Sequence, residues 1–192
     1  MAAGISYDLE VQVASPEVCN VASIYRLAGG FNLEDSALVT GSKLAPLAPL
    51  AVNFATRKAV AVKSFIVQAN AASNATAIRI KKGSLAYVGM FIGNGTVAKE
   101  VTAIDKSNAA YDALTVSLTA AVTAGNILFE ASADGATTPK NVANALNYAQ
   151  VTVGAGETVT AIGQVFEIVE ANLSLPVSSV DKANLGARFM FV

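Results

Sequence analysis

The side chains that most often carry acid–base or metal chemistry are scarce in this sequence. It contains no histidine and one cysteine, Cys19, so it lacks the most common general base and cannot supply the Cys/His ligands of a zinc site. A single cysteine also cannot form an internal disulfide, and we interpret Cys19 as an inert, small hydrophobic residue. We therefore expect neither a cofactor nor a metal site.

The carboxylates are spread along the chain, and no two of them form an obvious pair for acid–base catalysis. The stretch from Asp105 to Asp112, DKSNAAYD, offers oxygen atoms of the kind that calcium prefers. It lacks the spacing of an EF-hand and the glycine at its centre, so a hairpin loop is the better interpretation. The glycines between Gly83 and Gly95 form no phosphate-binding fingerprint, because no strand-to-helix pattern accompanies them. These observations predict no catalytic residues and a protein that is not an enzyme.

The composition limits the partners of the chain. Of its 192 residues, 53% are hydrophobic and only 14% are charged, against about 25% charged residues in an average soluble domain. The net charge of −1 argues against nucleic acid, because phosphate binding needs clustered Lys and Arg. No apolar run is long enough to predict a membrane span. The low charge leaves two interpretations open: an alanine-rich chain, or a surface that other subunits cover.

Short apolar runs alternate with turn residues from Lys58 to Ala131. Alternation of apolar and polar residues is typical of half-buried strands, and the breaks between the runs are rich in Gly, Asn and Ser. The pattern predicts antiparallel hairpins with strands near 59–68, 77–81, 85–92, 97–104, 114–118 and 127–130. We expect an all-β fold: an antiparallel, hairpin-rich small barrel or sandwich, with an extended N-terminal arm and one or two short helices.

Two later segments carry specific local signals. Residues 158–169 show the clearest strand pattern in the later part of the chain, and Gly163 inside it suggests a bulge or a close backbone approach. Residues 178–185 favour a short helix, with Ser178 as N-cap and Asp181 three positions later. Gly186 then stands where a C-cap is expected.

Residues 1–43 form the predicted arm, and residues 44–192 the main all-β domain. Residues 7–13 alternate apolar with polar side chains, as an edge strand does, and glycines interrupt the stretch from 16 to 43. Pro46 and Pro49 favour an extended connector. The apolar residues of the arm either pack onto the main domain or contact a partner. The candidate partner contacts of the arm are Leu9, Val11, Val13, Tyr25, Leu27, Phe31 and Leu33.

The last five residues, RFMFV, predict a terminal strand. An apolar strand at the end of a chain must be paired, because an exposed one would aggregate, and closed symmetry would bury it between protomers. The candidate oligomer contacts are Phe189, Met190 and Phe191, and we expect a homo-oligomer.

Five phrases follow one another from about Lys43 to Val192: KLAPLAPLAVNFATRKAVAVK, ATAIRIKKGSLAYVGMFIGNG, AIDKSNAAYDALTV, LFEASADGATTPKNVANALNY and LGARFMFV. In this order they resemble the head fiber proteins of phages and prophages of gut Bacteroides-type bacteria, and more loosely capsid decoration proteins. The resemblance implies a virion structural protein, made in the cytoplasm of the bacterial host and attached to the outer surface of the capsid. It makes the candidate partner contacts of the arm candidate capsid contacts. It further implies a homotrimer whose partner is the major capsid protein, and it brings no catalytic residues.

Two other classes of function stay open. A carbohydrate-binding β-module, displayed on the virion for host adhesion, would expose aromatic side chains beside Asp and Asn clusters, and Tyr87, Tyr111 and Tyr148 are its candidates. A small β-barrel hydrolase would need a carboxylate pair or a Ser/Lys arrangement, and neither is visible in the sequence.

Overall fold

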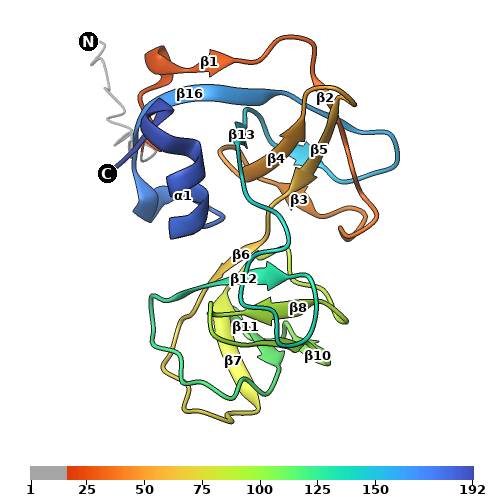
Figure 1. Ribbon diagram of the computed structural model, residues 1–192, viewed down its shortest axis with the longest axis vertical. Coiled ribbons are helices and arrows are strands. Elements are labelled where there is room, and N and C mark those ends of the chain that lie inside the picture. Colours follow the sequence, from red (N-terminus) through yellow and green to blue (C-terminus); the bar gives the residue numbers. More distant parts are fainter. Residues whose placement is uncertain (1–16) are drawn as a thin grey trace, which may run out of the picture.

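Short strands in several open sheets, one α-helix and three 3-10 turns make up residues 17–192, the part of the chain that the computed structural model describes (Figure 1). Residues 1–16 lie outside the described residues, and with them the predicted contacts Leu9, Val11 and Val13. The all-β class and the short helix are confirmed. No sheet of the described part closes into a barrel, which removes that option.

The chain builds two lobes, and the second is an insertion into the first (Figure 1). We call residues 17–63 and 140–192 the base lobe, and residues 64–139 the inserted lobe. Each lobe has its own hydrophobic clusters, and among the described residues Leu85 is the one buried residue that joins a cluster of the other lobe. The predicted single domain from residue 44 onward is therefore interrupted by a body with a separate core.

An open sheet in the order β1-β16-β13-β4-β5-β2-β15 forms the base lobe, and the terminal strand β17 also pairs with β16. A two-stranded sheet joins β3 and β14. The strands are β1 (Tyr25–Arg26), β2 (Phe31–Leu33), β3 (Lys43–Leu44), β4 (Pro49–Asn53), β5 (Lys58–Ala61), β13 (Ala145–Asn147), β14 (Val151–Thr152), β15 (Thr158–Val159), β16 (Ala161–Ile168) and β17 (Phe189–Phe191). The helical elements are η1 (Val21–Ser23), η2 (Glu170–Asn172), α1 (Ser179–Leu185) and η3 (Gly186–Arg188).

Residues 18–27 run along β16, the longest strand, rather than away from the folded body. The backbone N–H of Val169 donates to the carbonyl of Val18 at 2.9 Å, and the N–H of Leu27 donates to the carbonyl of Ala161 at 2.8 Å. Between these two ends β1 pairs antiparallel with β16. This segment therefore shields one edge of β16.

Strand β2 lies inside the base sheet, between β5 and β15. Its outer residues, Phe31 and Leu33, are buried, while Asn32 between them is exposed. The prediction of an extended arm is therefore wrong for residues 17–43. Its apolar residues belong to the core, because β5 and β15 supply backbone partners that are distant in the sequence.

Gly163 is a point of close contact, as its place inside a strand predicted. A Cβ atom on Gly163 would lie 2.9 Å from Cδ2 of Leu27, which is closer than van der Waals contact allows. The missing side chain thus lets the N-terminal segment lie flat on β16.

The short helix begins and ends where its capping residues predicted. The Ser178 hydroxyl accepts a hydrogen bond from the Asp181 N–H at 3.1 Å, and the Asp181 carboxylate accepts one from the Ser178 N–H at 3.3 Å. These reciprocal bonds form a capping box. Gly186 ends α1 with φ of +63°, a conformation that glycine adopts without strain.

Two sheets form the inserted lobe, in the orders β10-β11-β7 and β6-β12-β8-β9. A hairpin joins β10 to β11, as residues 105–112 predicted. The strands are β6 (Ser64–Ile66), β7 (Ala77–Lys81), β8 (Phe91–Gly93), β9 (Ala98–Glu100), β10 (Ala103–Asp105), β11 (Tyr111–Thr115) and β12 (Ile127–Ala131).

Candidate functional site

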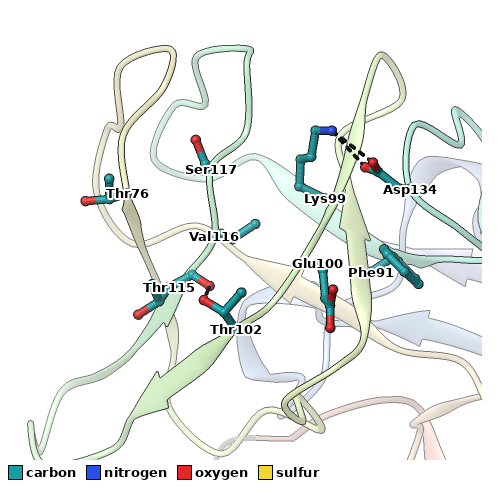
Figure 2. A pocket seen from close by; sticks show the side chains of 9 residues that line it. All are labelled: Thr76, Phe91, Lys99, Glu100, Thr102, Thr115, Val116, Ser117 and Asp134. Atoms are coloured by element: carbon teal, nitrogen blue, oxygen red, sulfur yellow. Dashed lines mark hydrogen bonds and ion pairs between the residues drawn. The ribbon is translucent and has the colours of Figure 1, made fainter.

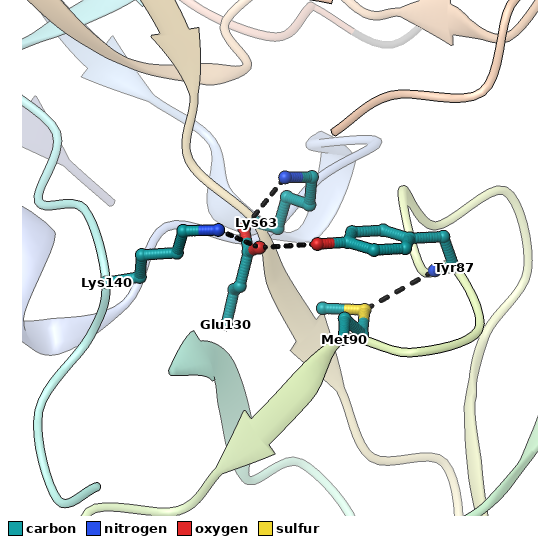
Figure 3. Close-up of polar contacts among 5 residues, drawn as sticks. All are labelled: Lys63, Tyr87, Met90, Glu130 and Lys140. Carbon is teal, nitrogen blue, oxygen red and sulfur yellow. Dashed lines mark hydrogen bonds and ion pairs between the residues drawn. The ribbon is translucent and has the colours of Figure 1, made fainter. Parts of the chain in front are cut away.

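A buried ionic cluster lies where the chain passes between the two lobes (Figure 3). Glu130, on β12 of the inserted lobe, accepts a hydrogen bond from Lys63 Nζ at 2.7 Å and one from Lys140 Nζ at 3.2 Å. Lys63 lies on the segment by which the chain leaves the base lobe for the inserted lobe, and Lys140 lies on the segment by which the chain returns. The side chains of Lys63 and Glu130 are 2% and 4% exposed. At this burial each charge needs the opposite charge of the other residue to offset its loss of solvation.

Tyr87 completes this cluster from a turn of the inserted lobe (Figure 3). Its hydroxyl donates to Glu130 Oε1 at 3.0 Å, and its backbone N–H donates to the Met90 sulfur at 3.4 Å. Burial, together with the charge and the hydrogen bond of Glu130, raises the pKa of Tyr87 to about 12. The phenol therefore stays a proton donor at neutral pH.

The charge state of Glu130 results from two opposing effects. Burial alone would raise the pKa of its carboxyl, but the hydrogen bonds and charges of Lys63 and Lys140 outweigh burial and lower the pKa. Glu130 is thus ionised at neutral pH with every oxygen occupied. This arrangement ties Lys63 and Lys140, on the two segments that join the lobes, to β12 of the inserted lobe.

Two further contacts fix one lobe against the other. Lys81 Nζ, on β7, donates to the carbonyl of Leu173 in the base lobe at 2.8 Å. Leu85 packs into the base-lobe cluster that contains Leu50 and Leu175. With the Glu130 cluster, these contacts tie the inserted lobe to the base lobe at three places.

An open groove of about 520 Å³, which we call the junction groove, lies where the two sheets of the inserted lobe meet (Figure 2). Lys99 and Asp134 form an ion pair at 2.9 Å on its rim, and the Thr102 hydroxyl donates to the carbonyl of Thr115 at 3.2 Å. Glu100 contributes the one other carboxylate of the groove. The lining consists of Thr76, Phe91, Lys99, Glu100, Thr102, Thr115, Val116, Ser117 and Asp134.

A second open groove, of about 740 Å³, lies over the outer face of β7 and β11, and we call it the alanine groove. Half of its lining residues are alanines, and the guanidinium of Arg79 lies 4.7 Å from the ring centre of Tyr111. The lining consists of Ala69, Asn70, Ala71, Ala72, Ala75, Ala77, Arg79, Asp105, Ser107, Asn108, Tyr111 and Ala113.

Within residues 17–192, no three Cys, Asp or Glu side chains lie close enough together to hold a metal ion. Cys19 is buried, and burial, followed by the charge of Glu17, raises the pKa of its thiol. A thiol with a raised pKa is a poor nucleophile. Over the same part of the chain, no helix has the length and apolar character needed to cross a membrane.

The structure does not bring the predicted capsid contacts together on one surface. Phe31 and Leu33 are in the core, Leu27 is partly buried against it, and Tyr25 is 65% exposed. Of these four described residues, Tyr25 alone is well placed to contact a partner.

The predicted oligomer contacts lie on β17, which pairs in parallel with β16 of the same chain. Phe189 is buried in the base-lobe core, Phe191 packs partly against that core, and Met190 is 45% exposed. The terminal strand is therefore already paired within one chain, and it does not need a second protomer to cover its edge. Of the three side chains, Met190 is the one that is exposed.

The sequence interpretation missed the Glu130 cluster. Its signal was available, because Glu130 interrupts the apolar run Ile127–Ala131 and Lys63 follows directly on Val60–Val62. A charged residue at a position that the strand pattern buries must find an opposite charge. Which residues would pair could not be read from the sequence, since Lys63 and Glu130 are 67 positions apart.

Comparison with known proteins supplies the context for these features. The model of the family described as "Head fiber protein" matches residues 2–191 of the chain. No curated protein and no solved structure matches it. The match covers nearly the whole chain, including both lobes and the neck, by which we mean the two chain segments around Lys63 and Lys140 that join them. The chain therefore belongs to the phage head fiber protein family, and it is a structural component of a phage virion.

Proposed function

We propose that this head fiber protein is attached to the outer surface of the capsid as a homotrimer, with the base lobe on the shell and the inserted lobe pointing outward. The major capsid protein is its partner, and the resemblance in sequence suggests a host among gut Bacteroides-type bacteria, in whose cytoplasm the protein is made. A structural family favours a role without catalysis.

The distribution of exposed apolar side chains is the observation that carries this orientation. Every exposed large hydrophobic residue of the described chain, apart from Val88, lies on the base lobe. Exposed apolar side chains that gather in one place are typical of protein contacts, and three of those on the base lobe, Val21, Met190 and Val192, line one groove. The base-lobe residues are Val21, Tyr25, Val39, Phe54, Tyr148, Val180, Met190 and Val192.

The two ends of the described chain meet at one groove of the base lobe. Val21, Met190 and Val192 line one groove of about 680 Å³, and Glu17, the first described residue, also lines it. Glu17, which follows residues 1–16 in the sequence, therefore lies beside exposed apolar side chains. We propose that Leu9, Val11 and Val13 extend from here to the shell, where residues 7–13 add a strand to an exposed sheet edge.

Trimer formation would serve attachment by bringing three such segments close together. Linked binding elements can raise the overall affinity by roughly 10² to 10⁴ without any new contact. We propose Met190, with its neighbour Val192, as a contact between protomers, and Tyr25 as a contact to the shell.

Two measurements separate these contacts. Met190→Asn should convert a particle of three 19.6 kDa chains into a monomer in light scattering. Tyr25→Ala and deletion of residues 1–16 should keep the trimer but reduce co-sedimentation with empty capsids at least tenfold. Val88→Asn, on the inserted lobe, is the matched control and should change neither. A wild-type monomer, or unchanged capsid binding by the deletion, would contradict the proposal.

A further inference from the structure

The alanine groove has the composition of a binding site rather than of an ordinary strand surface. Ala77 and Ala113 face outward from β7 and β11, between much longer side chains. Their short side chains leave a trough with an apolar floor. Ligand sites commonly combine such a floor with a few polar groups that fix orientation.

Charged groups of opposite sign face each other across this floor. In the strand register Ala113 lies opposite Arg79 on one side and opposite Asp105 on the other. Adjacent strands are about 4.8 Å apart, so the guanidinium and the carboxylate come from strands about 10 Å apart. That separation suits an extended ligand of two or more sugar rings.

Arg79, the cation of this pair, is held in position by a neighbouring ring, but no acidic side chain of the described residues neutralises its charge. Arg79 forms no ion pair within the described residues, and its guanidinium stacks on the ring of Tyr111. Stacking leaves the N–H groups at the edge of the guanidinium free to bind an anion. An arginine held in this way binds a carboxylate through two parallel hydrogen bonds.

The rim of the groove is held in place before any ligand binds. Lys82 Nζ donates to the carbonyls of Lys106 and Asn108 at 2.6 and 2.8 Å and pairs with the buried Asp112 at 2.9 Å. These bonds fix the loop between β10 and β11. A preorganised rim lowers the entropy lost on binding.

Hydrogen-bonding groups of both kinds remain available on this rim. Asn70 and Asn108 use their side-chain oxygens to accept from the N–H groups of Ala124 and Ala110, which leaves their amide NH₂ groups as donors. The pKa of Asp105 is lowered by its hydrogen bonds from Ser107, so this carboxylate is an acceptor at neutral pH. Sugar hydroxyls, which both donate and accept, match this mixture.

We propose that the alanine groove binds an oligosaccharide that carries a carboxylate, with the carboxylate on Arg79 and the hydroxyls of the next ring on Asp105. The apolar faces of the sugar rings lie on Ala113 and against Tyr111. This site belongs to the inserted lobe, away from β1, β16 and the C-terminus on the base lobe (Figure 1), and does not depend on attachment to a capsid.

The test uses the full-length protein and three tetrasaccharides, of galacturonate, glucuronate and mannuronate, in NMR titrations. At least one should bind and shift the side-chain amide signals of Asn70 and Asn108. The same tetrasaccharide with its carboxylates reduced to alcohols should bind at least tenfold more weakly, because hydrogen bonds to a charged group are stronger than those to a neutral hydroxyl.

Two variants and one control locate the site. Arg79→Gln should lose at least tenfold in affinity, and Ala113→Leu, which fills the floor, should abolish binding. Glu100→Gln, in the junction groove, should bind as the wild type does, and an unchanged melting temperature shows that each variant is folded. Absence of binding by all three tetrasaccharides at millimolar concentration, or binding that survives both Arg79→Gln and Ala113→Leu, would overturn the proposal.

Discussion

Lys63 and Glu130 face each other across the neck of the molecule, 2.7 Å apart and almost completely buried. Lys63 ends the first segment of the base lobe, and Glu130 lies on the last strand of the inserted lobe. A backbone hydrogen bond joins the same two residues: the N–H of Glu130 donates to the carbonyl of Lys63 at 2.9 Å. One pair of residues thus closes the insertion where it begins and ends.

Removing the charge of Glu130 should strongly destabilise the protein. Glu130→Gln leaves Lys63 buried without a counter-ion, and breaking a buried pair in this way costs about 3–5 kcal/mol. The free energy of unfolding, measured with urea, would show this loss. Lys140→Met is the matched control: its side chain is 43% exposed, so we expect a loss of about 1 kcal/mol or less. Equal losses for both variants would contradict the assigned roles.

Acid should weaken the same interaction. The folded-state pKa of Glu130 lies below its usual value of 4.5, so the folded protein binds fewer protons than the unfolded chain. The contribution of ionised Glu130 to the free energy of unfolding is therefore complete above the usual pKa. It is lost as pH falls through the lower, folded-state pKa. The difference in unfolding free energy between wild type and Glu130→Gln should shrink from pH 7 to pH 3. A difference that grows in acid would show that the pKa is raised instead.

The contact between Gly163 and Leu27 offers a test of how the N-terminal segment packs. Gly163→Ala places a methyl group 2.9 Å from Leu27 Cδ2, and overpacking of this kind costs about 1–3 kcal/mol. Leu27→Ala removes the clashing atoms. The double variant should therefore lose less stability than the two single losses add up to. Additive losses in thermal unfolding would place Leu27 elsewhere.

Two truncations should behave differently. Deleting residues 1–42 removes β1 and β2, exposes an edge of β16 and takes Phe31 and Leu33 out of the core, so the product should be unfolded or insoluble. Deleting residues 1–16 removes none of the described contacts and should leave the melting temperature within a few degrees of the wild type. Circular dichroism and solubility distinguish the outcomes, and a folded, soluble product of the longer deletion would contradict the packing of β2.

Local signals in the sequence were reliable wherever the structure depends on neighbours in the chain. Ser178, Asp181 and Gly186 predicted the ends of α1, and Gly163 predicted a close contact, because caps and tight approaches need particular residue types. The hairpin between β10 and β11 followed in the same way from its turn residues.

Features that depend on distant partners could not be predicted from the sequence. The glycine-rich stretch before Lys43 looked like a free arm, since its partners on β5, β15 and β16 lie far along the chain. The insertion could not be predicted either, because the strands of both lobes show the same alternation of apolar and polar residues. The run 97–104 looked like one strand, yet it divides into β9 and β10 in different sheets, and this division helps to form the junction groove.

The central claim, that the base lobe sits on the outside of the capsid and the inserted lobe projects from it, is tested most directly by cryo-electron microscopy of purified virions. The account predicts threefold-symmetric density on the outer shell, with residues 17–63 and 140–192 nearest to the capsid and residues 64–139 at the outer end. Density at the tail or inside the shell, or an inserted lobe in contact with the capsid, would contradict it.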